Sequence, residues 1–142
     1  MKKIIVIVFI IFIIAISCKD DYYSSSDCSS PDYSNCNGTE PKYGQLTIDL
    51  TINSENPKVP ISIYTGKVED NVLYLNDTAS SASYTATVDI NHYYSVKAEY
   101  KSGTKTIIAI DGDDVKSKTN TYCDSTCWRV QNGSIDVRLK YN

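Results

Sequence analysis

A Ser–His or Cys–His catalytic arrangement would have to use His92, the single histidine of the chain. The sequence contains no Gly-x-Ser-x-Gly, His-x-x-x-His or Gly-rich phosphate-binding motif that would support such a site. His92 also falls in a predicted turn, where solvation explains a histidine without catalysis. Asp and Glu are plentiful enough for glycoside hydrolysis, but a small domain with a filled core offers no cleft for a sugar. We therefore expect no enzymatic activity and no cofactor.

The run Asp111-Gly112-Asp113-Asp114 places three carboxylates within four residues, a composition that calcium accepts. It lacks the twelve-residue framework and the closing Glu of an EF-hand. The apolar run Thr106 to Ile110, which precedes it, is typical of a buried strand. We therefore favour a polar turn after that strand over a calcium site, and we expect no bound metal.

The first seventeen residues predict a secretion signal. Lys2 and Lys3 precede an unbroken apolar run from Ile4 to Ile16. As a helix this run would span about 20 Å, which is short of the roughly 30 Å hydrocarbon core of a bilayer. We therefore predict an exported chain from which residues 1–17 are removed.

Cys18, directly after the small residue Ser17, resembles the acylated cysteine of bacterial lipoprotein precursors. Ala15 departs from the usual Leu, Val or Ile of that pattern, and ordinary signal-peptidase cleavage is the alternative. Parity favours lipidation, because removing Cys18 from the five cysteines leaves an even four. Lys19-Asp20-Asp21 resembles the export signal of surface lipoproteins in Bacteroidota. The resemblance implies a lipid-anchored, surface-exposed outer-membrane protein, with a periplasm-facing orientation as the alternative.

Residues 18–42 predict a flexible tether, because Ser, Asp, Asn and Tyr dominate and no aliphatic residue is present from position 19 onward. In an oxidising compartment we expect the four remaining cysteines to form disulfides rather than a zinc site, whose two-residue spacings are absent. We favour local pairs, Cys28 with Cys36 and Cys123 with Cys127. Crossed pairs, which would join the tether to the domain, are the alternative.

From Tyr43 to the C-terminus, apolar and polar residues alternate with the period of a β-strand. Seven or eight such segments in about 100 residues predict an all-β sandwich over residues 43–142. Pro60 predicts a sheet edge or a bulge for the strand that contains it. The polar stretch Asn76 to Ser83 predicts a loop. Apolar residues on both faces of Thr106 to Ile110 predict a central strand.

The last segments predict a hairpin. Asn132-Gly133 lies between two alternating segments, which is the strongest short hairpin signal. Trp128, one residue beyond Cys127, is expected to pack against the Cys123–Cys127 disulfide in the core, as in many sandwiches.

The stretch from Tyr84 to Tyr100 is too long for one strand of a small domain, so we predict a three-residue turn at Asn91-His92-Tyr93. After it, Tyr94 and the alternating Val96 and Ala98 resemble the tyrosine corner of immunoglobulin-like and fibronectin-type sandwiches. The same corner suits the transthyretin-like accessory domains of bacterial surface proteins. The resemblance implies an immunoglobulin-like sandwich in which Tyr94 hydrogen-bonds to upstream backbone.

These features predict a non-enzymatic surface lipoprotein whose sandwich docks to another surface protein, as an accessory subunit of an outer-membrane assembly. Open sheet edges are one means of docking, and Pro60 with Glu69 and Asp70 is predicted to guard one such edge. The alternative function is carbohydrate binding by exposed tyrosines, which would require a row of aromatic rings on one face. The candidate tyrosines are Tyr64, Tyr74 and Tyr93.

Charge and one short motif complete the sequence-based expectations. Loss of Lys2 and Lys3 leaves 12 basic against 17 acidic side chains, a net charge of −5, so we expect no nucleic-acid partner. Asp77-Thr78-Ala79 resembles the acceptor of O-linked glycans on exported Bacteroidota proteins, and Asp124-Ser125-Thr126 fits it loosely. Thr78 is therefore a candidate glycosylation site.

Overall fold

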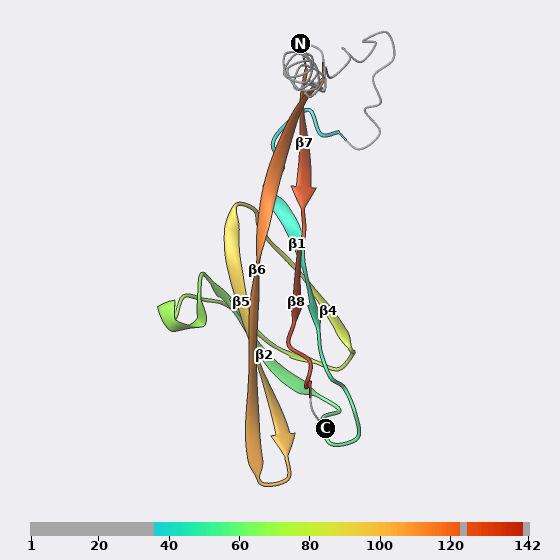
Figure 1. The fold of residues 1–142 in the computed structure, drawn as a ribbon, viewed down its shortest axis with the longest axis vertical. Helices are drawn as coiled ribbons and strands as arrows, with labels where there is room; N and C mark the ends of the chain where they lie inside the picture. The colour runs from blue at the N-terminus through green and yellow to red at the C-terminus, as the bar shows by residue number, and fades with distance from the viewer. Residues whose placement is uncertain (1–35, 123–124, 141–142) are drawn as a thin grey trace, which may run out of the picture. The chain divides into compact units, whose positions relative to one another are not determined.

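A computed structural model describes residues 36–122 and 125–140 of the protein. The predictions for Cys18, Lys19-Asp20-Asp21, Cys28 and Cys123 lie outside these residues. The described residues form an all-β sandwich of eight strands, as predicted (Figure 1). The strands are β1 (Tyr43–Asp49), β2 (Val59–Thr65), β3 (Leu73–Ala79), β4 (Ser83–Asp89), β5 (His92–Ser102), β6 (Lys105–Tyr122), β7 (Ser125–Gln131) and β8 (Gly133–Asp136), with a short 3-10 helix η1 (Val68–Asp70).

The strands form one sheet of three, in the order β4-β1-β8, and one of five, in the order β3-β2-β5-β6-β7. β1 pairs antiparallel with β4 and parallel with β8. β6 is the longest strand and runs along much of the sandwich (Figure 1). It pairs with β5 through residues 105–115 and with β7 through residues 116–122, so its two halves have different partners.

The hydrophobic core lies between the two sheets and confirms the alternation that the sequence predicts. β1 and the residue after it contribute Leu46, Ile48 and Leu50, all of which are buried. β5 contributes Tyr94, Val96, Ala98 and Tyr100, each of which is almost fully buried. Together with the other core residues they close the sandwich; these others are Val59, Ile61, Ile63, Ala79, Ala86, Val88, Ile90, Val115, Ile135 and Val137.

The chain changes sheets between β4 and β5, and Tyr94 lies at this corner. The Tyr94 hydroxyl donates to the Asp89 carbonyl oxygen at 3.0 Å, the contact that the resemblance to a tyrosine corner implies. Only two residues, Ile90 and Asn91, connect the strands, so the predicted three-residue turn is wrong. In a hairpin, a three-residue turn would be needed to keep the apolar residues of both strands on the same face. Because β4 and β5 belong to facing sheets, both point their alternating apolar residues inward without the extra residue.

Tyr94→Phe is expected to lower the free energy of unfolding by about 1–2 kcal/mol, because the Asp89 carbonyl oxygen loses its donor beside a buried ring. Chemical denaturation measures this change, with Tyr93→Phe, at an exposed ring, as the control. Burial raises the pKa of Tyr94 from 10.0 to about 12. Its contribution to stability is therefore complete below pH 10 and is lost as the pH rises towards 12, so the variant should lose less stability over that range. Equal effects of the two variants would contradict this role for the corner.

Three local predictions about strands can be compared with the structure. Pro60 lies in β2, between β3 and β5, so the predicted sheet edge is wrong, whereas the alternative of a bulge in this strand agrees with the register shift between Ile63 and Tyr64. It is tolerated there because it is the second residue of β2, and pairing with β5 begins only at Ile61. Glu69 and Asp70 belong to η1, and Glu69 lines a surface hollow with Ile110 and Gly112 of β6. Much of the predicted loop at 76–83 is strand, because β3 extends to Ala79.

The predicted hairpin at Asn132-Gly133 is also wrong. β7 pairs with β6 in the five-stranded sheet, whereas β8 pairs with β1 in the other sheet. The Asn132 side-chain oxygen accepts the backbone N–H of Gln45 in β1 at 2.9 Å. The Asn-Gly pair therefore marks a crossing between sheets.

Candidate docking surface

Side-chain hydrogen bonds close the seam between β3 and β4, where the two sheets meet. The Tyr84 hydroxyl donates to the Asp77 carboxylate at 2.6 Å, and the Tyr74 hydroxyl donates to the Thr87 carbonyl oxygen at 3.3 Å. The first of these bonds lowers the pKa of Asp77 and raises the pKa of Tyr84 to about 12. These two bonds tie β3 to β4, although most side chains of β3 remain exposed.

Carboxylates close part of the opposite seam, between β6 and β8. The backbone N–H of Asp136 donates to Asp111 at 2.9 Å, and that of Ser134 donates to Asp113 at 2.8 Å. The predicted polar turn is therefore wrong, because these carboxylates lie within strand β6 and hold the backbone of β8. Among the described residues, no group of three or more His, Cys, Asp or Glu side chains could hold a metal ion.

The first six residues of β6, Lys105–Ile110, form what we call the β6 edge. Along one side they pair with β5. Along the other side no described strand pairs with them, because β7 begins to pair only at Lys116 and the contacts with β8 begin at Asp111. β6 lies between β5 and β7 in the sheet order, as predicted for a central strand, but its segment Thr106 to Ile110 has a strand neighbour on one side only. The apolar residues on both faces of this segment are not covered by neighbouring strands.

Large apolar side chains are exposed along the β6 edge. The exposed fractions are 39% for Ile107, 55% for Ile108 and 53% for Ile110. On the outer face of the sheet, Ile108 and Ile110 lie opposite Glu99 and Lys97 of β5, which form an ion pair at 2.8 Å. That ion pair satisfies the charges of β5 and leaves the apolar side chains of β6 uncovered.

The apolar strip continues along the outer face beyond Ile110. The next residue on this face is Gly112, where a Cβ atom would overlap the Tyr93 hydroxyl. The ring of Tyr93 therefore lies over the glycine and takes the place of a side chain on β6. Ile108, Ile110 and Tyr93 thus line one side of the sheet next to the open edge.

The β6 edge lacks the features by which sheet edges usually avoid association. It contains no proline, its eleven-residue register with β5 has no bulge, and its one charged residue is Lys105. An open edge of this kind presents unpaired backbone N–H and C=O groups beside apolar side chains. This combination suits the addition of a β-strand from a partner.

The candidate sugar-binding tyrosines do not form a row. Tyr64 is buried. Tyr74 lies at the β3–β4 seam with its ring edge-on to that of Tyr94, at a centroid distance of 5.5 Å. Tyr93 lies over β6 on the outer face. The three rings therefore present no common stacking surface.

Two further candidates from the sequence have exposed positions. His92 is the first residue of β5, and its ring lies edge-on to that of Tyr94 at 6.2 Å. Thr78 lies opposite Pro60 in β3, and its backbone N–H donates to the Asp77 carboxylate at 2.7 Å. The exposed hydroxyl-bearing side chain of Thr78 is accessible to modification.

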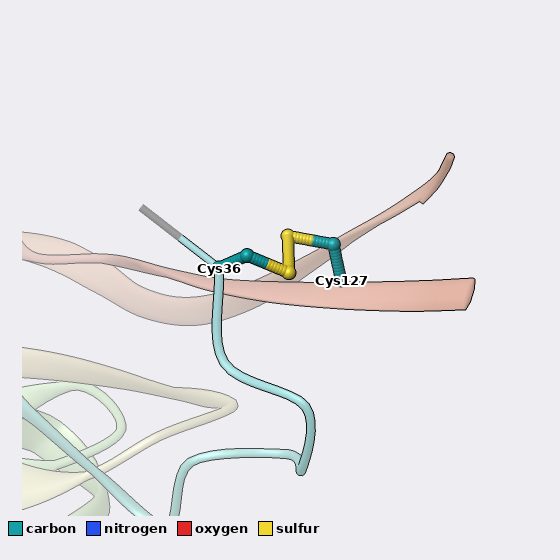
Figure 2. Close-up of a disulfide and its surroundings, with 2 residues drawn as sticks. All are labelled: Cys36 and Cys127. Atoms are coloured by element: carbon teal, nitrogen blue, oxygen red, sulfur yellow. A yellow bond between two sulfur atoms is a disulfide. The ribbon is translucent and has the colours of Figure 1, made fainter. Parts of the chain in front are cut away.

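A disulfide joins Cys36 to Cys127 of β7, with 5.1 Å between their Cα atoms (Figure 2). Next to it, Asn37 and Trp128 exchange two backbone hydrogen bonds, at 3.0 and 2.9 Å. The predicted local pairs are therefore wrong, because this backbone pairing brings Cys36 to the buried side chain of Cys127. Trp128 follows Cys127 on the strand, points to the opposite face and is not part of the core.

None of the described residues forms a helix with the length and apolarity needed to span a membrane. Comparison of the chain with protein-family models, with curated proteins and with solved structures finds no match.

Proposed function

We propose that the protein is a surface lipoprotein of the outer membrane, anchored through lipid on Cys18, whose sandwich docks to another surface protein without catalysis. Lys19-Asp20-Asp21 serves as its export signal. The β6 edge is the observation that carries this proposal. It combines unpaired strand backbone with three exposed isoleucines, the arrangement that strand addition requires.

Two further features support the proposal. The Cys36–Cys127 disulfide suits an exported protein, because such bonds persist in oxidising compartments. The seams at Tyr84–Asp77 and Asp113–Ser134 are bridged by the domain's own side chains, whereas no described strand pairs with the outer side of the β6 edge. The dispersed tyrosines give the carbohydrate-binding alternative no comparable support.

Site-specific crosslinking on intact cells tests this function. A photo-crosslinking amino acid replaces Ile108 in the full chain, and captured proteins are purified and identified. The matched control places the same group at Val72, which is 54% exposed and directly precedes β3, a strand separated from β6 by two others in the sheet order. We expect one stoichiometric surface partner from position 108 and none from position 72. Equal capture from both positions, or none from either, would refute docking at the β6 edge.

A further inference from the structure

We infer that the strand that pairs with the β6 edge is the same edge of a second copy of this chain, related by a two-fold axis through Ile108. This inference rests on the proposed function, because both treat the edge as a docking surface. It goes further by identifying the docked surface protein as a second copy of this chain and by naming the register.

The faces of β6 restrict the register. Directly opposite residues of an antiparallel ladder share a face, so Ile107, Ala109 and Asp111 lie on the inner face with Tyr100, Ala98 and Val96. Lys105 also lies on the inner face, because it is two residues before Ile107 on the strand. A two-fold axis perpendicular to the sheet keeps the inner and outer faces of both copies on the same sides. The axis must therefore pass through a residue, because an axis between residues would pair an inner side chain with an outer one.

An axis through Ile108 makes the edge complementary to itself. The Ile108 side chains of the two copies meet each other, and Ile107 meets Ala109 twice. Lys105 of each copy then lies opposite Asp111 of the other, whose carboxylate also accepts the backbone N–H of Asp136. The two ends of the ladder thus bring opposite charges together. No bulge interrupts the β6 backbone over these positions. The added ladder would cover the apolar strip formed by Ile108 and Ile110.

The chemistry of the edge therefore defines its partner. A strand that matches it antiparallel needs an acid opposite Lys105, aliphatic residues opposite Ile107 and Ile108, and a base opposite Asp111. The edge of a second copy, running antiparallel, meets these requirements. Its Asp111 lies opposite Lys105, and its Ala109 and Ile108 lie opposite Ile107 and Ile108. The proposed lipid anchor would also hold copies on one surface, which raises their effective concentration.

Disulfide trapping tests the register. In antiparallel pairing, directly opposite Cα atoms lie about 4.5–5.5 Å apart, within the range of a disulfide. Ile108→Cys in the full chain should therefore form a covalent dimer under mild oxidation. Ile110→Cys is the matched control. The two copies of position 110 would lie four residues apart along the ladder, at about 13 Å, and should not crosslink.

The outcomes separate the inference from the proposed function. A covalent dimer from Ile108→Cys alone, above the level of the parent chain, supports the second copy. Equal dimer from both cysteine variants indicates random collision and overturns the inference. If neither variant dimerises but the photo-crosslinker at position 108 captures a different protein, docking stands and the second copy fails. If neither experiment finds a partner, both fail.

Charge reversal tests the complementarity independently. Lys105→Glu would place two acidic pairs at the ends of the ladder, and we expect self-association to weaken by about tenfold. Lys118→Glu makes the same charge change in the half of β6 that pairs with β7 and should leave the association unchanged. Sedimentation of the detergent-extracted full chain measures both. Equal effects of the two variants would contradict the proposed register.

Discussion

Replacement of both Cys36 and Cys127 by serine is expected to lower the free energy of unfolding by about 4.5 kcal/mol and the melting temperature by roughly 20 °C. The two cysteines are 91 residues apart, so the disulfide closes a loop that contains most of the described strands. In the chain-entropy model, a cross-link over a loop of this length removes far more freedom from the unfolded chain than a short one.

Thermal unfolding followed by circular dichroism measures this effect. The parent chain and the double variant should melt at about the same temperature when both are reduced, since neither then contains a disulfide. A loss of only about 2 to 2.5 kcal/mol would be the value for a short loop, as in the local pairing of Cys123 with Cys127, and would contradict the long-range bond.

Gly133→Val is expected to lower the free energy of unfolding by about 3 kcal/mol, because it overpacks the core where the chain crosses between sheets. A Cβ atom at Gly133 would lie 2.7 Å from Cδ1 of Leu46 and 3.0 Å from Cγ2 of Val115. Both neighbours are fully buried, so neither can move away without disturbing others. The larger side chain would push β8 away from β1.

Chemical denaturation of Gly133→Val should be compared with that of Gly38→Val, where a Cβ atom would meet nothing within 4 Å. The control should leave stability nearly unchanged. If the two variants were equally stable, Gly133 would not be a packing glycine, and the close approach of β8 to β1 would be contradicted.

The alternating pattern of the sequence was sufficient to predict which side chains form the core. Residues such as Leu46, Ile48 and Val96 are buried because a strand points every second side chain to the same face. That rule depends only on the local backbone. The corner at Tyr94 could likewise be found, because its hydrogen bond to Asp89 spans only five residues.

The wrong predictions concern which strands lie side by side. Asn132-Gly133 has the composition of a hairpin turn, but β7 already pairs with β6, which directly precedes it in sequence. β8 pairs instead with β1, far away in sequence, so the two flanking strands belong to different sheets. The isoleucines of the β6 edge were recognised as a strand with two apolar faces. Whether a neighbour covers them depends on where β7 stops pairing, which periodicity does not specify. The pairing of Cys36 with Cys127 likewise depends on which segments lie side by side, which periodicity does not specify.

The position of the disulfide also determines how the domain would respond to a mechanical pull. Tension applied from the N-terminal side of Cys36 passes through the covalent bond to Cys127 and so enters the fold at β7. The backbone from residue 37 to residue 126, including β1 and the β6 edge, lies within the covalent loop and is shielded from extension. A pull between the N-terminal side of Cys36 and the C-terminal end of β7 would load β7 through Cys127, while the core strands between the two cysteines stay folded.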